Sequence, residues 1–158
     1  MEQITLCPMT REKCHQLFRD WQNDPAVYAD PADYRPYTYD AAAVDRYFDA
    51  RQQPDRVVLA VMLADRPIGE VSLKHIDREK GVCALGIHLQ NDSVKGRGYG
   101  TQAERLAVRY AFDSLGLHTV LADALIANTR SQRALEKAGF AFVSEDGQFR
   151  YYRCEDLK

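Results

Sequence analysis

The sequence predicts a mixed α/β fold in which one central sheet carries helices on both of its faces. Between residues 57 and 90, three apolar segments follow one another with only short polar turns between them, which is typical of antiparallel strands joined as hairpins. After residue 90, strand patterns and helix patterns alternate, which is typical of strand–helix–strand units. A meander combined with two such units predicts a mixed sheet with a helical layer on each face.

The first part of the chain predicts one strand and two helices. The strand lies within residues 3–9 and is interrupted by Pro8. Thr10 and Asp40 are residue types that cap helix N-termini, so a helix is expected to begin at each of them. Apolar residues recur at helical spacing in both segments, at Cys14, Leu17, Phe18 and Trp21 in the first and at Val44, Tyr47 and Phe48 in the second. Residues 23–40 between them hold three prolines and four tyrosines and predict a loop with at most short helical turns.

Residues 57–158 predict six further strands and two helices. Three strands are expected at 57–63, 68–76 and 82–90, followed by a long helix over 99–116. Gly116 stands where a left-handed residue ends a helix, and Gly139 ends the last helix, at 128–139, in the same way. A strand at 118–126 lies between the helices, and a hairpin closes the chain. The total is about seven strands in a single domain spanning residues 1–158.

Composition and charge exclude several classes of protein. The 158 residues are 46% hydrophobic and 28% charged, an ordinary mix for a folded domain. The net charge of −2 lacks the basic excess of duplex-binding proteins, so no nucleic-acid partner is expected. No apolar run approaches the ~18 residues of a membrane span, and the N-terminus lacks signal-peptide features. The four cysteines are scattered without metal-ligand spacing, so we expect a cytoplasmic protein with free thiols and no metal.

The segment "VKGRGYGTQA", residues 94–103, predicts a phosphate site. Gly96, Gly98 and Gly100 alternate immediately before the longest helix pattern of the chain. A helix N-terminus presents unpaired N–H groups and a positive partial charge, and glycines let a ligand approach the backbone closely. Lys95 and Arg97 add positive charge at the rim. The alternative is a tight glycine turn with two solvated cations, but three alternating glycines favour the phosphate.

The common nucleotide-binding motifs fit this segment poorly. The Walker pattern GxxxxGK[ST] is absent, and the sixth position of the dinucleotide pattern GxGxxG is occupied by Thr101. The glycines also follow an antiparallel meander, whereas the dinucleotide pattern opens a βαβ unit. A dinucleotide-dependent oxidoreductase is therefore disfavoured.

The segment instead resembles the acetyl-CoA-binding pattern [RQ]-x-x-G-x-[GA] of the GNAT superfamily of N-acetyltransferases, with Lys95 in place of the usual Arg or Gln. A second block, "NTRSQRALEKAGF", resembles the family's N-x-x-S segment. Its matching residues are Asn128, Ser131, Lys137, Gly139 and Phe140. The opening "FRDWQNDPAVY" resembles the RimJ/RimL-like branch, and the resemblance extends over essentially the whole chain.

This resemblance implies a GNAT fold whose sheet is splayed between its fourth and fifth strands, and an acetyl-CoA-dependent enzyme without a metal. The pantetheine arm of the cofactor would lie in the splay and pair with the backbone of His88, Leu89 and Gln90. Its pyrophosphate would lie on the segment formed by Lys95, Gly96, Arg97, Gly98, Tyr99, Gly100 and Thr101. Asn128 and Ser131 would also contact the cofactor, although Asn128 is equally suited to cap the last helix. The acetyl group would pass directly to a primary amine in a ternary complex, in a monomer or a homodimer.

The catalytic groups depart from the family pattern. Ala84 stands where many members carry a glutamate base, and Leu135 stands where many carry a tyrosine acid. His88 lies on the same strand face as Ala84 and is the candidate base, with a packed histidine as the alternative. Ser131 is the candidate proton donor, with a capping role as the alternative. Glu70 is expected on the other face of its strand and ranks below His88.

The acceptor is expected to enter beside residues 24–40. This segment carries the aspartates Asp24, Asp30, Asp33 and Asp40 and the tyrosines Tyr28, Tyr34, Tyr37 and Tyr39. Carboxylates and aromatic faces favour a cationic amine, either a small molecule or a peptide or protein N-terminus, while the alternative is a solvated loop. A non-catalytic acyl-CoA-binding or sensor module on the same fold is the alternative function, and Ala84 and Leu135 favour it.

Overall fold

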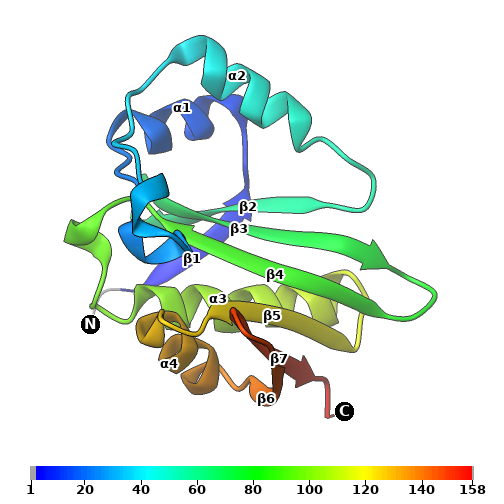
Figure 1. The fold of residues 1–158 in the computed structure, drawn as a ribbon. Helices are drawn as coiled ribbons and strands as arrows, with labels where there is room; N and C mark the ends of the chain where they lie inside the picture. The colour runs from blue at the N-terminus through cyan, green and yellow to red at the C-terminus, as the bar shows by residue number, and fades with distance from the viewer. Residues whose placement is uncertain (1–2, 158) are drawn as a thin grey trace.

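The computed structural model describes residues 3–157, which form one seven-stranded sheet with helices on both faces (Figure 1). The strands are β1 (Ile4–Pro8), β2 (Val57–Leu63), β3 (Arg66–Asp77), β4 (Val82–Leu89), β5 (Thr119–Leu125), β6 (Ala141–Glu145) and β7 (Phe149–Glu155). The helices are α1 (Arg11–Arg19), α2 (Ala41–Ala50), α3 (Tyr99–Arg109) and α4 (Thr129–Lys137). The predicted fold class is confirmed. Residues 1, 2 and 158 of the predicted domain lie outside the described part of the chain.

Helices α1 and α2 cover one face of the sheet, and both begin at the predicted caps (Figure 1). The Thr10 hydroxyl accepts a hydrogen bond from the Lys13 N–H at 3.2 Å, and the Asp40 carboxylate accepts one from the Ala42 N–H at 3.1 Å. Their apolar faces meet in a small core of their own, formed by Cys14, Leu17, Phe18 and Val44. The two helices therefore form a separately packed layer above strands β2–β4.

Helix α3 packs on the opposite face through small side chains. Ala103, Ala107 and Ala111 are fully buried in the main core, and small residues at this spacing let a helix approach a sheet closely. The helix was expected to run to residue 116, but its last turn, Tyr110–Ser114, is a π-helical turn. Gly116 then adopts the expected left-handed conformation, with φ of 69°.

The sheet opens between β4 and β5, as predicted. These two parallel strands pair only at Val82–Thr119, Cys83–Val120 and Ala84–Leu121. Beyond Ala84, β4 continues for five residues without a recorded partner on that side, while β5 is paired along its whole length with β7. A strand edge with free N–H and C=O groups is thereby left inside the fold, where it can bind an extended ligand.

No helix within residues 3–157 is long and apolar enough to cross a membrane. In the same range, no three His, Cys, Asp or Glu side chains are placed together in a way that could hold a metal ion.

Candidate functional site

The opening between β4 and β5 leads into a cavity of about 1140 Å³. One part, which we call the glycine groove, lies between the end of β4, the start of α3 and the start of α4, and is lined by Leu89, Gly96, Gly98, Gly100 and Asn128. The other part, which we call the helix-side chamber, lies under α2 and is lined by Tyr47, Arg51, Glu70, Lys74 and His88. The cavity is large enough for an extended ligand together with a second, smaller molecule.

The glycine groove presents an uncapped helix N-terminus. Helices α1, α2 and α4 each have a side chain that accepts a hydrogen bond from their first turn, whereas α3 begins at Gly98 without one. Gly96 and Gly98 have φ of 72° and 81°, and a Cβ on either would project into open space. The first-turn N–H groups of α3 are therefore accessible to an anion, and the backbone around them is in a conformation that favours glycine.

The edge of β4 that faces the opening can be assigned from the hydrogen bonds on its other side. Gln90 donates its N–H to the Ile68 carbonyl at 2.7 Å, and His88 lies directly opposite Glu70 in the same register. Because alternate residues of a strand direct their backbone groups to opposite edges, His88 and Gln90 pair with β3 and Leu89 faces the opening. The Gln90 carbonyl also accepts from the Gln22 N–H at 2.8 Å. Of the three residues expected to bind the cofactor through their backbone, Leu89 is therefore the best placed.

The two cations of the glycine segment differ in their surroundings. The Lys95 ammonium lies 3.0 Å from Asp24 and 3.6 Å from Asp92, and its side chain is only 9% exposed. Burial opposes ionisation of Asp24, but hydrogen bonds from the Ala26 N–H and from Lys95 outweigh it and lower the pKa of Asp24. Arg97 is exposed and donates from Nε to the Ser93 carbonyl at 2.9 Å. Lys95 thus joins the start of the glycine segment to the loop after α1.

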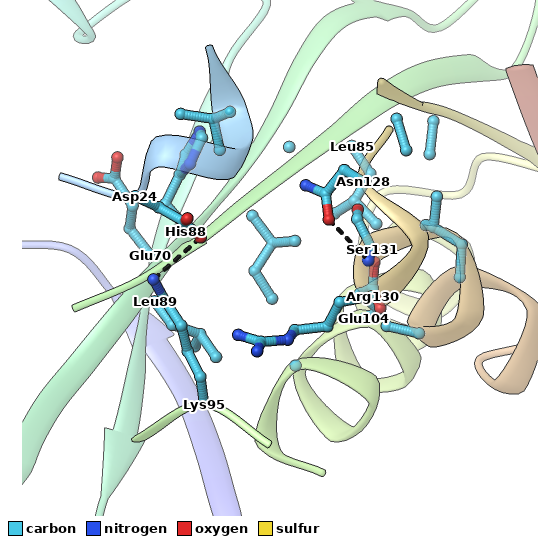
Figure 2. A pocket seen from close by; sticks show the side chains of 18 of the residues that line it. Asp24, Glu70, Leu85, His88, Leu89, Lys95, Glu104, Asn128, Arg130 and Ser131 are labelled. Carbon is cyan, nitrogen blue, oxygen red and sulfur yellow. Dashed lines mark hydrogen bonds and ion pairs between the residues drawn. The ribbon is translucent and has the colours of Figure 1, made fainter. Parts of the chain in front are cut away.

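Most of the predicted cofactor residues line the cavity. His88, Leu89, Lys95, Gly96, Gly98, Gly100, Thr101, Asn128 and Ser131 do so. Gln90, Arg97 and Tyr99, all within the described chain, are not part of its wall. The Tyr99 side chain is buried in the main core, so only its backbone could serve a ligand. Arg130 was not predicted, and Figure 2 shows its side chain extending from α4 across the cavity.

Asn128 and Ser131 lie together at the start of α4 (Figure 2). The Asn128 side chain accepts a hydrogen bond from the Ser131 N–H at 3.2 Å, which confirms its expected role as the cap of this helix. Both side chains also line the cavity. Leu135, one turn further along, is 2% exposed and belongs to the main core, so this position carries no side chain that could donate a proton.

The helix-side chamber corrects the expectation for Glu70. Residues that lie opposite one another in an antiparallel pair point to the same face, and Glu70 lies opposite His88. The expectation that Glu70 lies on the other face was wrong. Glu70 is 4% exposed, one carboxylate oxygen accepts a hydrogen bond from the Tyr47 hydroxyl of α2, and the other oxygen has no hydrogen-bond partner. Burial and the Glu70 charge raise the pKa of Tyr47, so its hydroxyl stays a donor.

The His88 side chain is exposed and lines the cavity. Desolvation lowers its pKa below the ordinary 6.5, and the neighbouring cations Lys74 and Arg51 act in the same direction, while Glu70 and Asp24 oppose them. The imidazole is therefore neutral at pH 7 and can accept a proton.

The carboxylates of the loop at 24–40 have mainly structural roles. Asp24 and Asp30 accept hydrogen bonds from Ala26 and Ala32 at 2.9 Å and begin the short 3₁₀ turns Pro25–Val27 and Pro31–Asp33. Asp40 caps α2. Among the four aspartates, only Asp24 lines the cavity, where it is paired with Lys95. Asp30, Asp33 and Asp40 are exposed and lie outside the cavity wall, as the alternative of a solvated loop requires.

Glu104 is a further ionisable residue of the cavity wall, and the sequence analysis missed it. Its side chain on α3 is 1% exposed, and one carboxyl oxygen has no hydrogen-bond partner. Burial raises the pKa of Glu104 to about 8, so the group is mostly protonated at pH 7. Helical spacing could have found it, because Glu104 lies four residues after Gly100 and three before Ala107, on the buried stripe of the helix.

Comparisons with known proteins agree with this arrangement. Residues 3–141 match the family model described as "Acetyltransferase (GNAT) domain". The "Probable N-acetyltransferase YjcK" of Bacillus subtilis (strain 168) is 43% identical over 76 residues, which are 48% of this chain and 42% of that protein. The "Uncharacterized N-acetyltransferase p20" of Bacillus licheniformis is 28% identical over 156 residues, which cover 96% of this chain and 84% of that protein.

Solved structures of the same fold include complexes with the expected cofactor. AAC(6')-Ib in complex with paromomycin and acetyl-CoA superposes with a TM-score of 0.75 at 23% identity, covering 98% of this chain and 94% of that one. Spermidine N-acetyltransferase from Vibrio cholerae in complex with CoA and spermine gives a TM-score of 0.77 at 18% identity, covering 97% and 95%. At these identities the likeness establishes the fold.

Proposed function

The chain belongs to the GNAT acetyltransferase family, and from this premise we propose that it transfers an acetyl group from acetyl-CoA to a primary amine. The observation that carries the proposal is the uncapped N-terminus of α3, opened by Gly96 and Gly98, beside the unpaired edge of β4. An anionic cofactor with an extended amide-containing arm matches both features. Its phosphates would meet the N–H groups, and its arm would lie along the strand.

The residues present fit acetyl-CoA. Gly96 and Gly98 leave open space beside the start of α3 in a backbone conformation that favours glycine, and Leu89 directs its backbone toward the opening. Arg130 extends across the cavity and would add a guanidinium to the phosphate site (Figure 2). When bound, acetyl-CoA would supply the acetyl group as a thioester; the transfer forms a C–N bond and breaks the C–S bond, and the nitrogen loses two protons, one to a base and then to solvent and the other to the sulfur.

Two groups of the helix-side chamber would serve the amine. The Glu70 carboxylate, whose second oxygen is unpaired, would attract and orient the incoming ammonium. The neutral His88 imidazole, opposite Glu70, would accept its proton and return it to solvent through the cavity. Tyr47 holds the carboxylate in place by its hydrogen bond.

Ser131 would supply the proton on the cofactor side. It lines the cavity at the start of α4, where its N–H is fixed by Asn128 and its hydroxyl is left to face the ligand. With Leu135 in the core, no tyrosine competes for this role. The serine in this position supports a place in the RimJ/RimL-like branch, and we propose a cytoplasmic enzyme acting as a monomer or homodimer.

Calorimetric titration of the purified chain with acetyl-CoA, CoA, NAD and ATP tests the cofactor. Binding of acetyl-CoA and CoA, without binding of NAD or ATP, is expected. Binding of NAD or ATP without CoA would overturn the proposal. Release of free thiol from acetyl-CoA is then measured with a panel of peptides and small amines. Tight binding with no amine-dependent thiol release would instead favour the non-catalytic acyl-CoA-binding module.

A further inference from the structure

The helix-side chamber contains two cations that form no ion pair within the described residues. Lys74 projects from β3 and Arg51 from the end of α2, and both line the cavity. Within residues 3–157, neither forms an ion pair, although exposed arginines elsewhere, such as Arg11 and Arg109, do. Both side chains are half-buried. A partly buried cation without an anionic partner is unfavourable in the free protein, so an anionic partner brought by a ligand is a natural explanation.

The two cations lie beside the groups proposed to handle the amine. Lys74 and Arg51 both lower the pKa of His88 through their charge, which places them near the imidazole. The Lys74 ammonium is 3.8 Å from the position that a Cβ on Gly86 would take, on β4 two residues before His88. The Arg51 guanidinium stacks on the Tyr47 ring at 3.5 Å, and Tyr47 in turn donates to Glu70. The cations and the proposed proton acceptor therefore share one chamber.

The charge of the chamber matches one negative group on the ligand. Among the charged residues that line the helix-side chamber, Lys74 and Arg51 stand against the single carboxylate of Glu70, and the nearby Asp24 is paired with Lys95. Asp123 of β5 also lines the cavity, but it is exposed and lies opposite Tyr151. A polyamine would bring several positive charges to a region that already has a positive excess, at a Coulombic cost. A monoanionic group on the acceptor would instead bring this region to neutrality.

We propose that the acceptor is an amino-carboxylate, such as an amino acid or a short peptide with a free C-terminus. Its carboxylate lies between Lys74 and Arg51, and its amino group is presented to Glu70 and His88. This substrate class rests on the proposed acetyl transfer, and it adds a carboxylate to the cationic amine that residues 24–40 had suggested. A carboxylate suits the site better than a phosphate dianion because the excess is a single positive charge.

The test compares two acceptors that differ only in the carboxylate. Glycyl-phenylalanine and glycyl-phenylalaninamide have the same amino group, and the change lies far enough from it to leave its basicity similar. We measure kcat/KM for each at saturating acetyl-CoA, with spermidine as a polycation, and measure binding of each to the chain in the presence and absence of CoA. The carboxylate dipeptide is expected to be favoured by about tenfold, the factor for one charge-assisted hydrogen bond.

Matched variants assign that preference to the chamber. In Lys74→Gln the ratio between the two dipeptides is expected to fall to about one, whereas Lys80→Gln, an exposed lysine in the turn between β3 and β4, keeps the ratio of the wild type. Arg51→Gln is expected to lower the same kcat/KM ratio, so the proposal can still be tested if the Lys74 variant does not fold. Equal or better use of the amide or of spermidine would overturn the proposal, as would a ratio unchanged in both variants. Failure of acetyl-CoA to bind would refute the proposed function. In that case the ratio of the binding affinities for the two dipeptides, measured without CoA, still tests the preference for a carboxylate.

Discussion

Glu104 makes the stability of this protein depend on pH in an unusual direction. Its carboxyl group is 1% exposed on α3, and burial raises the pKa of Glu104 from the ordinary 4.5 to about 8. The folded chain therefore binds this proton more tightly than the unfolded chain does. Its contribution to stability is complete below pH 4.5 and is lost as the pH rises to about 8. From 4.5 to 7, the loss amounts to about 3 kcal/mol at 1.36 kcal/mol per pH unit.

Glu104→Gln tests this directly, because glutamine has nearly the same shape and does not titrate. The free energy of unfolding in urea is measured for wild type and variant between pH 5 and pH 8. Relative to the wild type, the free energy of unfolding of the variant is expected to rise by roughly 3 kcal/mol between pH 5 and pH 8, which corresponds to about 10 °C in Tm. Taking the difference between the two proteins removes the contribution of every other titrating group. An exposed control, Glu79→Gln, is expected to follow the wild type at all pH values.

A constant difference between wild type and Glu104→Gln across this range would refute the reasoning, since it would mean that solvent reaches the carboxyl group. The same variant has a functional readout. Ionisation of Glu104 above pH 8 places a negative charge in the wall of the proposed cofactor site, where it repels an anionic ligand. CoA affinity is therefore expected to decline above pH 8 in the wild type and to remain constant in Glu104→Gln.

Other substitutions separate the proposed roles of the cavity residues. Gly100 has an ordinary φ, and a Cβ at this position would meet only Leu89, at 3.9 Å, so both Gly100→Glu and the isosteric Gly100→Gln are expected to fold. The charged Gly100→Glu should weaken CoA binding at least tenfold more than Gly100→Gln. Equal affinities of the two variants in calorimetry would contradict an anion site. His88→Gln is expected to lower kcat and to abolish the loss of activity at acid pH. In the wild type this loss is expected below pH 6.5, because the pKa of His88 is lowered from that value, and a pH–rate profile measures it. Glu70→Gln is expected to raise KM for the amine more than it changes kcat, and the reverse result in steady-state kinetics would make Glu70 the base. Ser131→Ala is expected to slow turnover about tenfold without changing CoA affinity, and an unchanged rate would leave Ser131 with no catalytic role.

The glycine groove could be predicted from the sequence because backbone conformation determines it. A left-handed residue at the start of a helix needs glycine, so Gly96 and Gly98 leave a local signal in the chain. The cap residues Thr10, Asp40 and Asn128 are equally local, because each acts within three residues of its own position. The same reasoning placed all seven strands, since apolar periodicity and turn residues are also properties of short segments, whereas the splay was expected only from the resemblance to the family.

The helix-side chamber could not be predicted in this way, because long-range pairing assembles it. Glu70 was assigned to the wrong face, since the face depends on the register between β3 and β4, and a shift of one residue reverses every side chain. Tyr47 reaches Glu70 from α2, which is 23 residues away in the chain. Lys95 illustrates the same limit. It was expected to face a phosphate, but the loop after α1 brings Asp24 to 3.0 Å from it.

The two halves of the cavity therefore differ in what determines them. The glycine groove would hold the proposed cofactor mainly through N–H and C=O groups that every residue has, so the sequence around it is constrained by conformation rather than by side-chain chemistry. The helix-side chamber is built from side chains on α2, β3 and β4, and exchanging one of them changes its charge without disturbing the sheet. Lys74 and Arg51 can thus redirect acceptor choice while the cofactor site stays the same. For this reason the solved structures of the same fold, with paromomycin or spermine beside the cofactor, establish the architecture of this protein and leave the acceptor to be decided by its own chamber.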